Sequence, residues 1–407
     1  MSAPSIRPRL DYLDLVRGLV IVLMALDHTR DFFLSGGGAF GAPENVAAAS
    51  PALFFTRWIT HFCAPTFVFL AGVGSFLSIA RGQDKGSLAK FLVIRGFWLI
   101  LLEFTIVKFG WSLSFKLDFV MWQVIWTIGW SMIALAAFVR LPPLAVALLG
   151  LIIICGHNLL DGITARDLGR FGWLWDGLHT VRPFAPLANP WPDWLNEHVP
   201  LAMQKTLKRI SCFNLYPVLP WFGVMCLGFG MGPLFVDPAR QKRDRIFTLG
   251  IWITMAFVAL RFMNGYGNPV PWKEMPDWYR AMMSFLNCTK YPPSLDFLLM
   301  TLGPALIMLG LVTNEPGNLG KFFVVFGRVP LFFYVIHLPA IHGLSELCKQ
   351  IWGTPGKDFW GNPTMQWKGF DLLGTYAVWI IVVLALFPLC WWYGKLKAKY
   401  GGILRYL

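Results

Sequence analysis

Residues 13–34 read LDLVRGLVIVLMALDHTRDFFL, an apolar stretch that also carries several ionisable side chains. A run of about 20 apolar residues is long enough to cross the hydrocarbon core of a bilayer as a helix. Charged groups inside that core cost about 3 kcal/mol each on insertion scales, so they normally face a protein interior or a watery cavity. We therefore predict a membrane helix whose polar side chains serve a function.

These polar side chains fall on one face of the predicted helix. At about 100° per residue, Arg17 and His28 lie only about 20° apart around the axis, and Asp14 and Asp31 fall within about 60° of them. The rise of about 1.5 Å per residue separates Arg17 from His28 by roughly 16 Å along the axis. The polar stripe therefore predicts the lining of a passage from one membrane surface to beyond the middle of the bilayer.

The rest of the chain repeats this apolar pattern. Of the 407 residues, 56% are hydrophobic and only 14% are charged. We predict an all-α, polytopic integral membrane protein with about ten transmembrane helices. The predicted segments are 13–34, 58–80, 88–108, 119–138, 144–157, 215–235, 246–264, 295–313, 322–347 and 373–393. The fifth segment is short for a span.

Lys and Arg residues predict the orientation, because short cytoplasmic loops retain them. They gather before the first segment, in alternate loops and after the last segment, at Arg7, Arg9, Arg81, Lys85, Lys90, Arg95, Arg140, Arg240, Lys242, Arg243, Arg245, Lys395, Lys397, Lys399 and Arg405. We predict cytoplasmic termini and one transmembrane domain, 1–407. Larger extracytoplasmic loops are expected near 158–213, 265–294 and 350–371. Topology and contact with anionic lipid then explain the net charge of +13, and no nucleic-acid partner is expected.

Four histidines share one depth in the predicted bundle: His28, His61, His337 and His342. His337 and His342 differ by about 140° around a helix, so they cannot both face one point. Because Glu346 lies four residues after His342, we assign the structural role to His342. A metal site from the other three would draw on three helices without a diagnostic spacing, so no metal is expected.

His28 is the candidate general base. An imidazole with a pKa near neutrality can accept a proton from an attacking amine or hydroxyl, and a carboxylate such as Asp31 or Asp27 can fix its tautomer. The alternative is a core histidine satisfied by Asp31. Arg17 could bind a phosphate or carboxylate of a ligand, or could pair with Asp14 three residues earlier.

Two helix starts are rich in proline and aromatic residues. Tyr216 to Trp221 read YPVLPW, and the unpaired N–H groups of such a helix start could bind an anion. Lys290 and Tyr291 lie in TKYPPS, residues 289–294. Lys290 is either an interfacial cation that extends toward water or a contact for a phosphate or carbonyl oxygen.

Several of these segments, taken in order, resemble a known family. They are 13–18, 24–31, 63–72 (CAPTFVFLAG), 216–221, 290–294 and 327–337 (GRVPLFFYVIH). Together they resemble bacterial members of the heparan-alpha-glucosaminide N-acetyltransferase catalytic-domain family. More loosely, the first segment is similar to the wider transmembrane acyltransferase superfamily that O-acylates cell-envelope sugars.

The resemblance implies acyl transfer across a membrane. Acetyl-CoA would enter from the cytoplasm, and a histidine near the far side would assist attack by an extracytoplasmic sugar amine or hydroxyl. In the lysosomal branch of the family the essential histidine comes slightly later, whereas residues 35–56 here contain none. His28 therefore takes this role by analogy with the sugar O-acylating branch.

We accordingly predict a multi-pass, acyl-CoA-dependent acyltransferase of the bacterial inner membrane that modifies an envelope carbohydrate by direct attack. The alternative is a transporter of a small anionic or sugar solute through the polar stripe. The expected partners are the bilayer, acyl-CoA and a carbohydrate, and a homodimer is left open. The assigned residues are His28, Asp27 and Asp31 for catalysis, Arg17 and Arg328 for the acyl-CoA, and Arg30, His61, Tyr216, Trp221, Lys290, Tyr291 and His337 for the acceptor.

Overall fold

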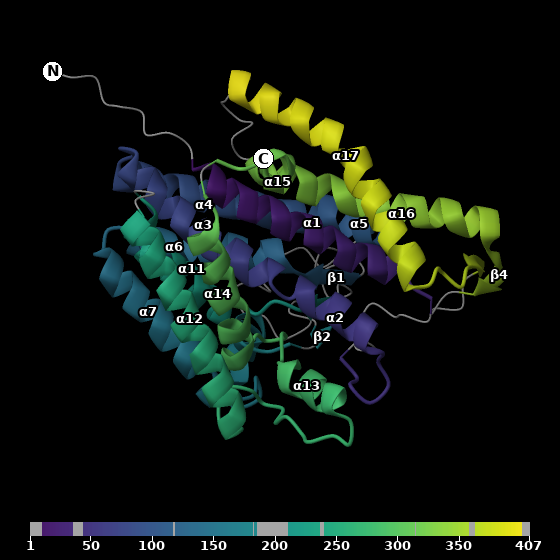
Figure 1. The fold of residues 1–407 in the computed structure, drawn as a ribbon, viewed down its shortest axis with the longest axis horizontal. Helices are drawn as coiled ribbons and strands as arrows, with labels where there is room; N and C mark the ends of the chain where they lie inside the picture. Colours follow the sequence, from purple (N-terminus) through teal and green to yellow (C-terminus); the bar gives the residue numbers. More distant parts are fainter. Residues whose placement is uncertain are drawn as a thin grey trace, which may run out of the picture.

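The computed structural model describes residues 10–35, 44–116, 119–181, 183–184, 211–236, 240–313, 315–357 and 363–400. Within these residues the chain is a bundle of helices with two small β-sheets at its loops (Figure 1). The prediction of a mostly helical protein is confirmed.

Helix α1, Asp11–Phe33, crosses the middle of the bundle (Figure 1). It packs on segments from both halves of the chain, namely α2 (Pro51–Thr60), α3 (Cys63–Ala80), α14 (Leu295–Leu311), α15 (Asn318–Arg328), α16 (Pro330–Trp352) and α17 (Leu372–Tyr400). Its charged residues Asp14, Asp27 and Arg30 are buried. The predicted polar helix thus faces the protein interior.

The other helices pack in pairs beside this centre. The pairs are α4 (Lys85–Leu102) with α6 (Val124–Phe138), α7 (Pro143–Gly156) with α11 (Val218–Met231), and α12 (Arg240–Met263) with α14. Shorter helices in the loops are α8 (Gly172–Leu178) and α13 (Trp278–Leu286), with 3-10 turns at η2 (His157–Leu160), η3 (Gly169–Phe171) and η4 (Gly232–Phe235).

Two of the predicted segments are each two helices. Segment 322–347 divides into α15 and α16 at Val329, because Pro330 lacks an N–H and disfavours helical geometry in the residue before it. Segment 58–80 divides at 61–62, between α2 and α3. Segment 88–108 covers most of α4 and the π-helical turn Glu103–Val107 that follows it. The chain then continues as the short helix α5, Lys108–Ser112.

The start of segment 119–138 is a strand, so the prediction of helix there is wrong. Strand β1, Phe119–Trp122, pairs in parallel with β3, Ser211–Asn214, and β2, Pro183–Phe184, pairs antiparallel with β3. Backbone pairing with a distant segment therefore decides the conformation of an apolar run that sequence alone reads as helix. A second sheet joins β4, Thr354–Lys357, to β5, Pro363–Gln366.

Six helical stretches in the described residues are long and apolar enough to cross a membrane: Pro51–Ala80, Pro143–Leu160, Val218–Phe235, Gln241–Met263, Pro330–Trp352 and Leu372–Tyr400. Val124–Phe138 and Leu295–Leu311 are shorter apolar helices. The short fifth segment is among the six, since η2 extends α7. These helices identify a multi-pass membrane protein, while ten spans and cytoplasmic termini stay predictions.

Two glycines let α1 and α15 approach until their backbones touch. A Cβ added at Gly18 would lie 1.8 Å from the carbonyl oxygen of Phe323, and one added at Gly327 would lie 1.7 Å from that of Asp14. Small residues are what permit such close helix contacts in membranes. This contact holds α1 against the C-terminal half of the chain.

We expect Gly18→Ala to destabilise the fold by about 1–3 kcal/mol, because the added methyl meets rigid backbone. Gly343→Ala is the matched control, since its Cβ would enter open space within α16 and a helical Gly→Ala change is neutral or favourable. Thermal unfolding in detergent compares the two variants. Equal melting temperatures would contradict the proposed backbone contact.

Candidate active site

A cavity of about 370 Å³ runs along α1. From this helix it is lined by Arg17, Ile21, Met24, Asp27, His28 and Asp31. The first and last of these residues are about 21 Å apart along the helix axis. Its size falls within the range of small-molecule sites. The polar stripe that the helical period indicated therefore lines an internal space.

His28 and Asp31 form a pair at one end of this cavity. The Nδ1 atom of His28 lies 3.5 Å from Oδ2 of Asp31, a long distance for a hydrogen bond. Arg30 donates from Nη2 to the other oxygen of Asp31 at 2.7 Å. The ring of His28 packs edge-on against Trp111, with centroids 5.2 Å apart. Asp31 thus lies between a guanidinium and an imidazole that lines the cavity.

Asp27 has a different environment, although it also lines the cavity. It accepts hydrogen bonds from Arg57 and, at 3.1 Å, from Arg30. Arg57 also donates to Glu44 at 3.3 Å and to the Tyr291 hydroxyl at 3.4 Å. Asp27 is therefore the counterion of two arginines. Of the two carboxylates that we considered as partners of His28, Asp31 is the one beside its ring.

Arg57 is a site residue that sequence reasoning missed. It lines the cavity from α2, one residue before the predicted segment 58–80. A lone cation immediately before an apolar run was the available signal, but such residues usually lie at the membrane surface. Packing of α2 against α1 is what brings Arg57 to Asp27, and the sequence around Arg57 does not show that packing.

Glu44 extends the charge network from the loop before α2. Burial would raise its pKa, yet its interaction with His61 and the charge of Arg57 lower that pKa to about 2. Glu44 is thus ionised at neutral pH. His61 is buried 3.9 Å from it, measured from Nε2 to Oε1, and packs against Phe297. His61 does not line the cavity, so its assignment to the acceptor receives no support from the geometry.

Tyr216, Lys290 and Tyr291 line the same end of the cavity as Asp27. Lys290 is buried, with its Nζ atom 5.1 Å from the centre of the Tyr291 ring, so it is not an interfacial cation. Trp221 is fully buried behind Tyr216 and does not reach the cavity. The YPVLPW segment therefore contributes its tyrosine, while its tryptophan supports that tyrosine.

The two histidines of α16 are both held by backbone. His337 is buried, and its Nδ1 lies 2.7 Å from the carbonyl oxygen of Tyr334. Its ring packs 5.3 Å from that of His28 but does not line the cavity. His342 contacts the carbonyl oxygen of Gly110 at 2.9 Å and lies 3.5 Å from Glu346, which fits the structural role we assigned to it.

Arg30 was assigned to the acceptor, and its position does not support that assignment. Arg30 is buried and does not line the cavity. Its guanidinium donates to Asp27 and Asp31, which are side chains of the same helix. Among the described residues, His28, His61 and His337 do not form a cluster that could hold a metal ion.

Positive side chains line the opposite end of the cavity. Arg17 and Arg328 were predicted there, and Arg95 and Lys397 join them. Arg17 is 3.1 Å from Asp14, so the predicted ion pair forms while the residue also lines the cavity. Arg328 is 3.1 Å from Asp11. Sequence reasoning assigned Arg95 and Lys397 to topology alone, because it could not show which basic residues turn inward.

An apolar helical bundle around a charged cavity defines a multi-pass membrane protein with an internal polar site. The chain belongs to the heparan-alpha-glucosaminide N-acetyltransferase catalytic family, whose model matches residues 9–262. This match confirms the resemblance that the sequence motifs indicated, and it implies an acetyltransferase. The segments 290–294 and 327–337 lie beyond the matched residues. No curated protein matches the chain.

Asp27→Asn should lower the stability of the protein by about 3 kcal/mol or more, because it leaves buried Arg57 beside a neutral amide. Asp11→Asn is the matched control, since its pair with Arg328 is partly exposed and should contribute at most about 1 kcal/mol. Thermal unfolding in detergent measures both variants. A melting temperature unchanged in Asp27→Asn would exclude a structural role for that ion pair.

Proposed function

We propose that this protein transfers an acetyl or similar short acyl group from acyl-CoA to an extracytoplasmic sugar amine or hydroxyl. One observation carries the proposal: a single cavity is lined by cations at one end and by the His28–Asp31 pair at the other. Membership of an acetyltransferase family supports transfer over the transport alternative, and nothing in the described residues favours transport.

The cationic end is suited to the nucleotide of acyl-CoA. Arg17, Arg95, Arg328 and Lys397 line it, and guanidinium groups bind phosphate through paired, charge-assisted hydrogen bonds. From Arg17 to His28 the distance along α1 is about 16 Å. The pantetheine arm of CoA is long enough to cover a distance of this order. A nucleotide held among the cations would therefore present its thioester near His28.

At the other end, His28 would act as general base through Nε2. The acceptor amine or hydroxyl attacks the thioester carbon, His28 takes the proton that the nucleophile loses, and a C–N or C–O bond forms. The C–S bond then breaks, and the departing CoA sulfur receives that proton from the imidazolium. No acyl-histidine is required, because the acceptor and the donor meet in the same cavity.

Two neighbouring groups would assist this step. Asp31 would be a positioning residue that holds the tautomer of His28, and the 3.5 Å separation of the two groups can shorten to a hydrogen bond once substrate is bound. Lys290 lines the same end of the cavity and would stabilise the negative charge that develops on the thioester oxygen. Tyr216 and Tyr291 would provide surfaces for the sugar.

The proposed direction of transfer follows from the distribution of basic residues. With cytoplasmic termini, the cationic end of the cavity faces the acyl-CoA of the cytoplasm and His28 lies toward the outside. We propose a bacterial inner membrane as the site of action, and an envelope glycan or periplasmic amino sugar as the acceptor.

We expect His28→Ala to abolish acceptor-dependent release of CoA while folding and acetyl-CoA binding persist. His342→Gln is the matched control, because it replaces a histidine that packs nearby but outside the cavity. Purified protein is assayed for free thiol with and without amino sugars, and acetyl-CoA binding is measured by calorimetry. Wild-type turnover in His28→Ala would refute the assignment of the base.

Asp31→Asn should lower kcat by tenfold or more with little change in KM, since Asp31 acts through His28. Asp31→Glu should recover part of the rate and shift the pH–rate profile, which loss of structure alone would not do. If Asp31→Asn and Asp31→Glu lost thermal stability and rate to the same extent as each other, the role of Asp31 would be structural.

Arg328→Gln should raise KM for acetyl-CoA about tenfold, equivalent to about 1.4 kcal/mol, with kcat nearly unchanged. Arg81→Gln is the control, because Arg81 is exposed and does not line the cavity. Comparing the KM for acetyl-CoA with the KM for its analogue lacking the 3′-phosphate shows whether Arg328 contacts that phosphate. An unchanged KM for acetyl-CoA in Arg328→Gln would show that Arg328 does not bind the donor.

A further inference from the structure

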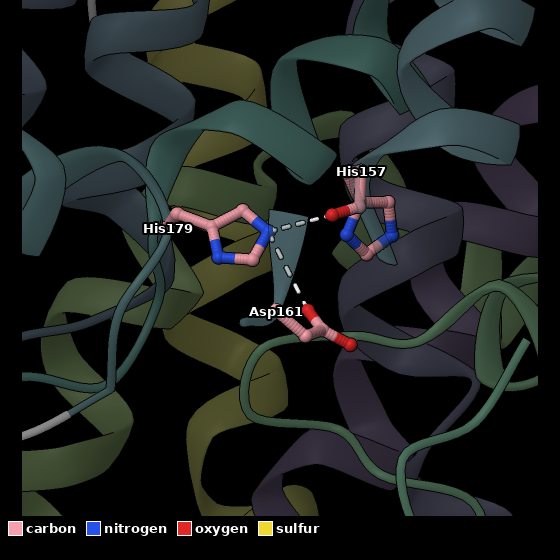
Figure 2. A group of neighbouring side chains, drawn as sticks. All are labelled: His157, Asp161 and His179. Atoms are coloured by element: carbon pink, nitrogen blue, oxygen red, sulfur yellow. Dashed lines mark hydrogen bonds and ion pairs between the residues drawn. The ribbon is translucent and has the colours of Figure 1, made fainter. Parts of the chain in front are cut away.

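A second cluster of ionisable side chains lies outside the cavity, where α7 ends. His157 begins η2, Asp161 follows η2, and His179 follows α8 (Figure 2). One nitrogen or oxygen atom of each side chain lies within 4.8 Å of those of the other two. Residues from the ends of α7 and α8 therefore converge on one point.

His157 gives the strongest indication that this cluster binds a ligand. His157 is only 1% exposed, and neither nitrogen of its ring has a hydrogen-bond partner in the described part of the chain. A buried polar atom without a partner costs about 1–3 kcal/mol. Figure 2 shows one ring nitrogen on the side toward His179 and Asp161. A bound cation would satisfy that nitrogen.

His179 and Asp161 are held in place by other contacts. The ring of His179 stacks on Trp175 with centroids 5.0 Å apart, and its Nε2 lies 2.9 Å from the carbonyl oxygen of His157. Asp161 accepts a hydrogen bond from Asn158 at Oδ2, while Oδ1 lies 3.6 Å from Nε2 of His179. One carboxylate oxygen is thus turned toward the two imidazoles.

The one ligand-to-ligand distance between His179 and Asp161 suits a metal ion that binds nitrogen and oxygen. Zinc bonds of about 2.0–2.2 Å at tetrahedral angles put neighbouring ligand atoms about 3.4 Å apart. The separation of 3.6 Å between His179 and Asp161 is close to that value. Two imidazoles and one carboxylate are typical ligands for zinc and related divalent transition metals, and water or the His157 carbonyl could complete the sphere.

We propose that His157, Asp161 and His179 bind a divalent transition metal ion of the zinc class. Binding would replace the proton through which His179 donates to the His157 carbonyl, so affinity should fall at low pH. This proposal is independent of the acyl-transfer function, because none of the three residues lines the cavity.

The position of the site indicates a structural role for the ion. Asn214 of β3 donates to the carbonyl oxygens of Asp176 and Thr180, on either side of His179. Tyr216, two residues after Asn214, lines the cavity. An ion that joins the end of α7 to the end of α8 would therefore stabilise the segment that supports one wall of the cavity.

The test uses the full-length protein in detergent, stripped with chelator and titrated with Zn²⁺ or with Co²⁺ as a visible probe. We expect one ion per chain, the absorption bands of tetrahedral Co²⁺ displaced by Zn²⁺, and a higher melting temperature with Zn²⁺. Asp161→Asn and His179→Gln should weaken Zn²⁺ binding at least tenfold. His342→Gln, a histidine outside the cluster, should bind Zn²⁺ like the wild type.

Asp161→Asn keeps the test decisive if replacing a buried histidine unfolds the chain, because the Asp161 side chain is 32% exposed. Failure of the wild-type protein to bind Zn²⁺ at micromolar concentration would overturn the proposal. Unchanged affinity in a folded Asp161→Asn variant would also overturn it, because the ion would then lie elsewhere.

Discussion

The structure depends on the pairing of buried charges along α1. An isolated charge inside an apolar bundle is too costly to persist, so each ionisable group on this helix must meet a partner or a watery space. Asp27 meets Arg57 and Arg30, and Asp14 meets Arg17. Of these contacts, the pair of Asp27 with Arg57 joins α1 to α2, and it holds the segment of α1 that carries His28 against α2.

The same requirement separates the two carboxylates next to His28. Asp27 is occupied by arginines, whereas Asp31 shares its two oxygens between Arg30 and the imidazole. A carboxylate that neutralises two cations supports the fold, and one that contacts an imidazole can orient a base. Two carboxylates four positions apart on one helix thus have different charged neighbours.

Close backbone contact completes the cavity. Gly18 and Gly327 allow α15 to lie against α1, and the break before Pro330 then redirects the chain into α16, which brings Tyr334 to the wall. Without that break, residues 322–347 would form one helix with a single apolar face. The cavity wall therefore depends on a proline and two glycines that have no chemical role of their own.

The amino-acid pattern by itself determined that this is a helical membrane protein and that Arg17 and His28 share a polar face, because hydrophobicity and the helical period are local properties. It also carried the family motifs. Only the tertiary structure decided which polar residues reach the cavity: it brought in Arg57, Arg95 and Lys397 and left Trp221 and His61 behind the wall. Helix rotation and breaks decide such placement, and both follow from packing between segments distant in the sequence.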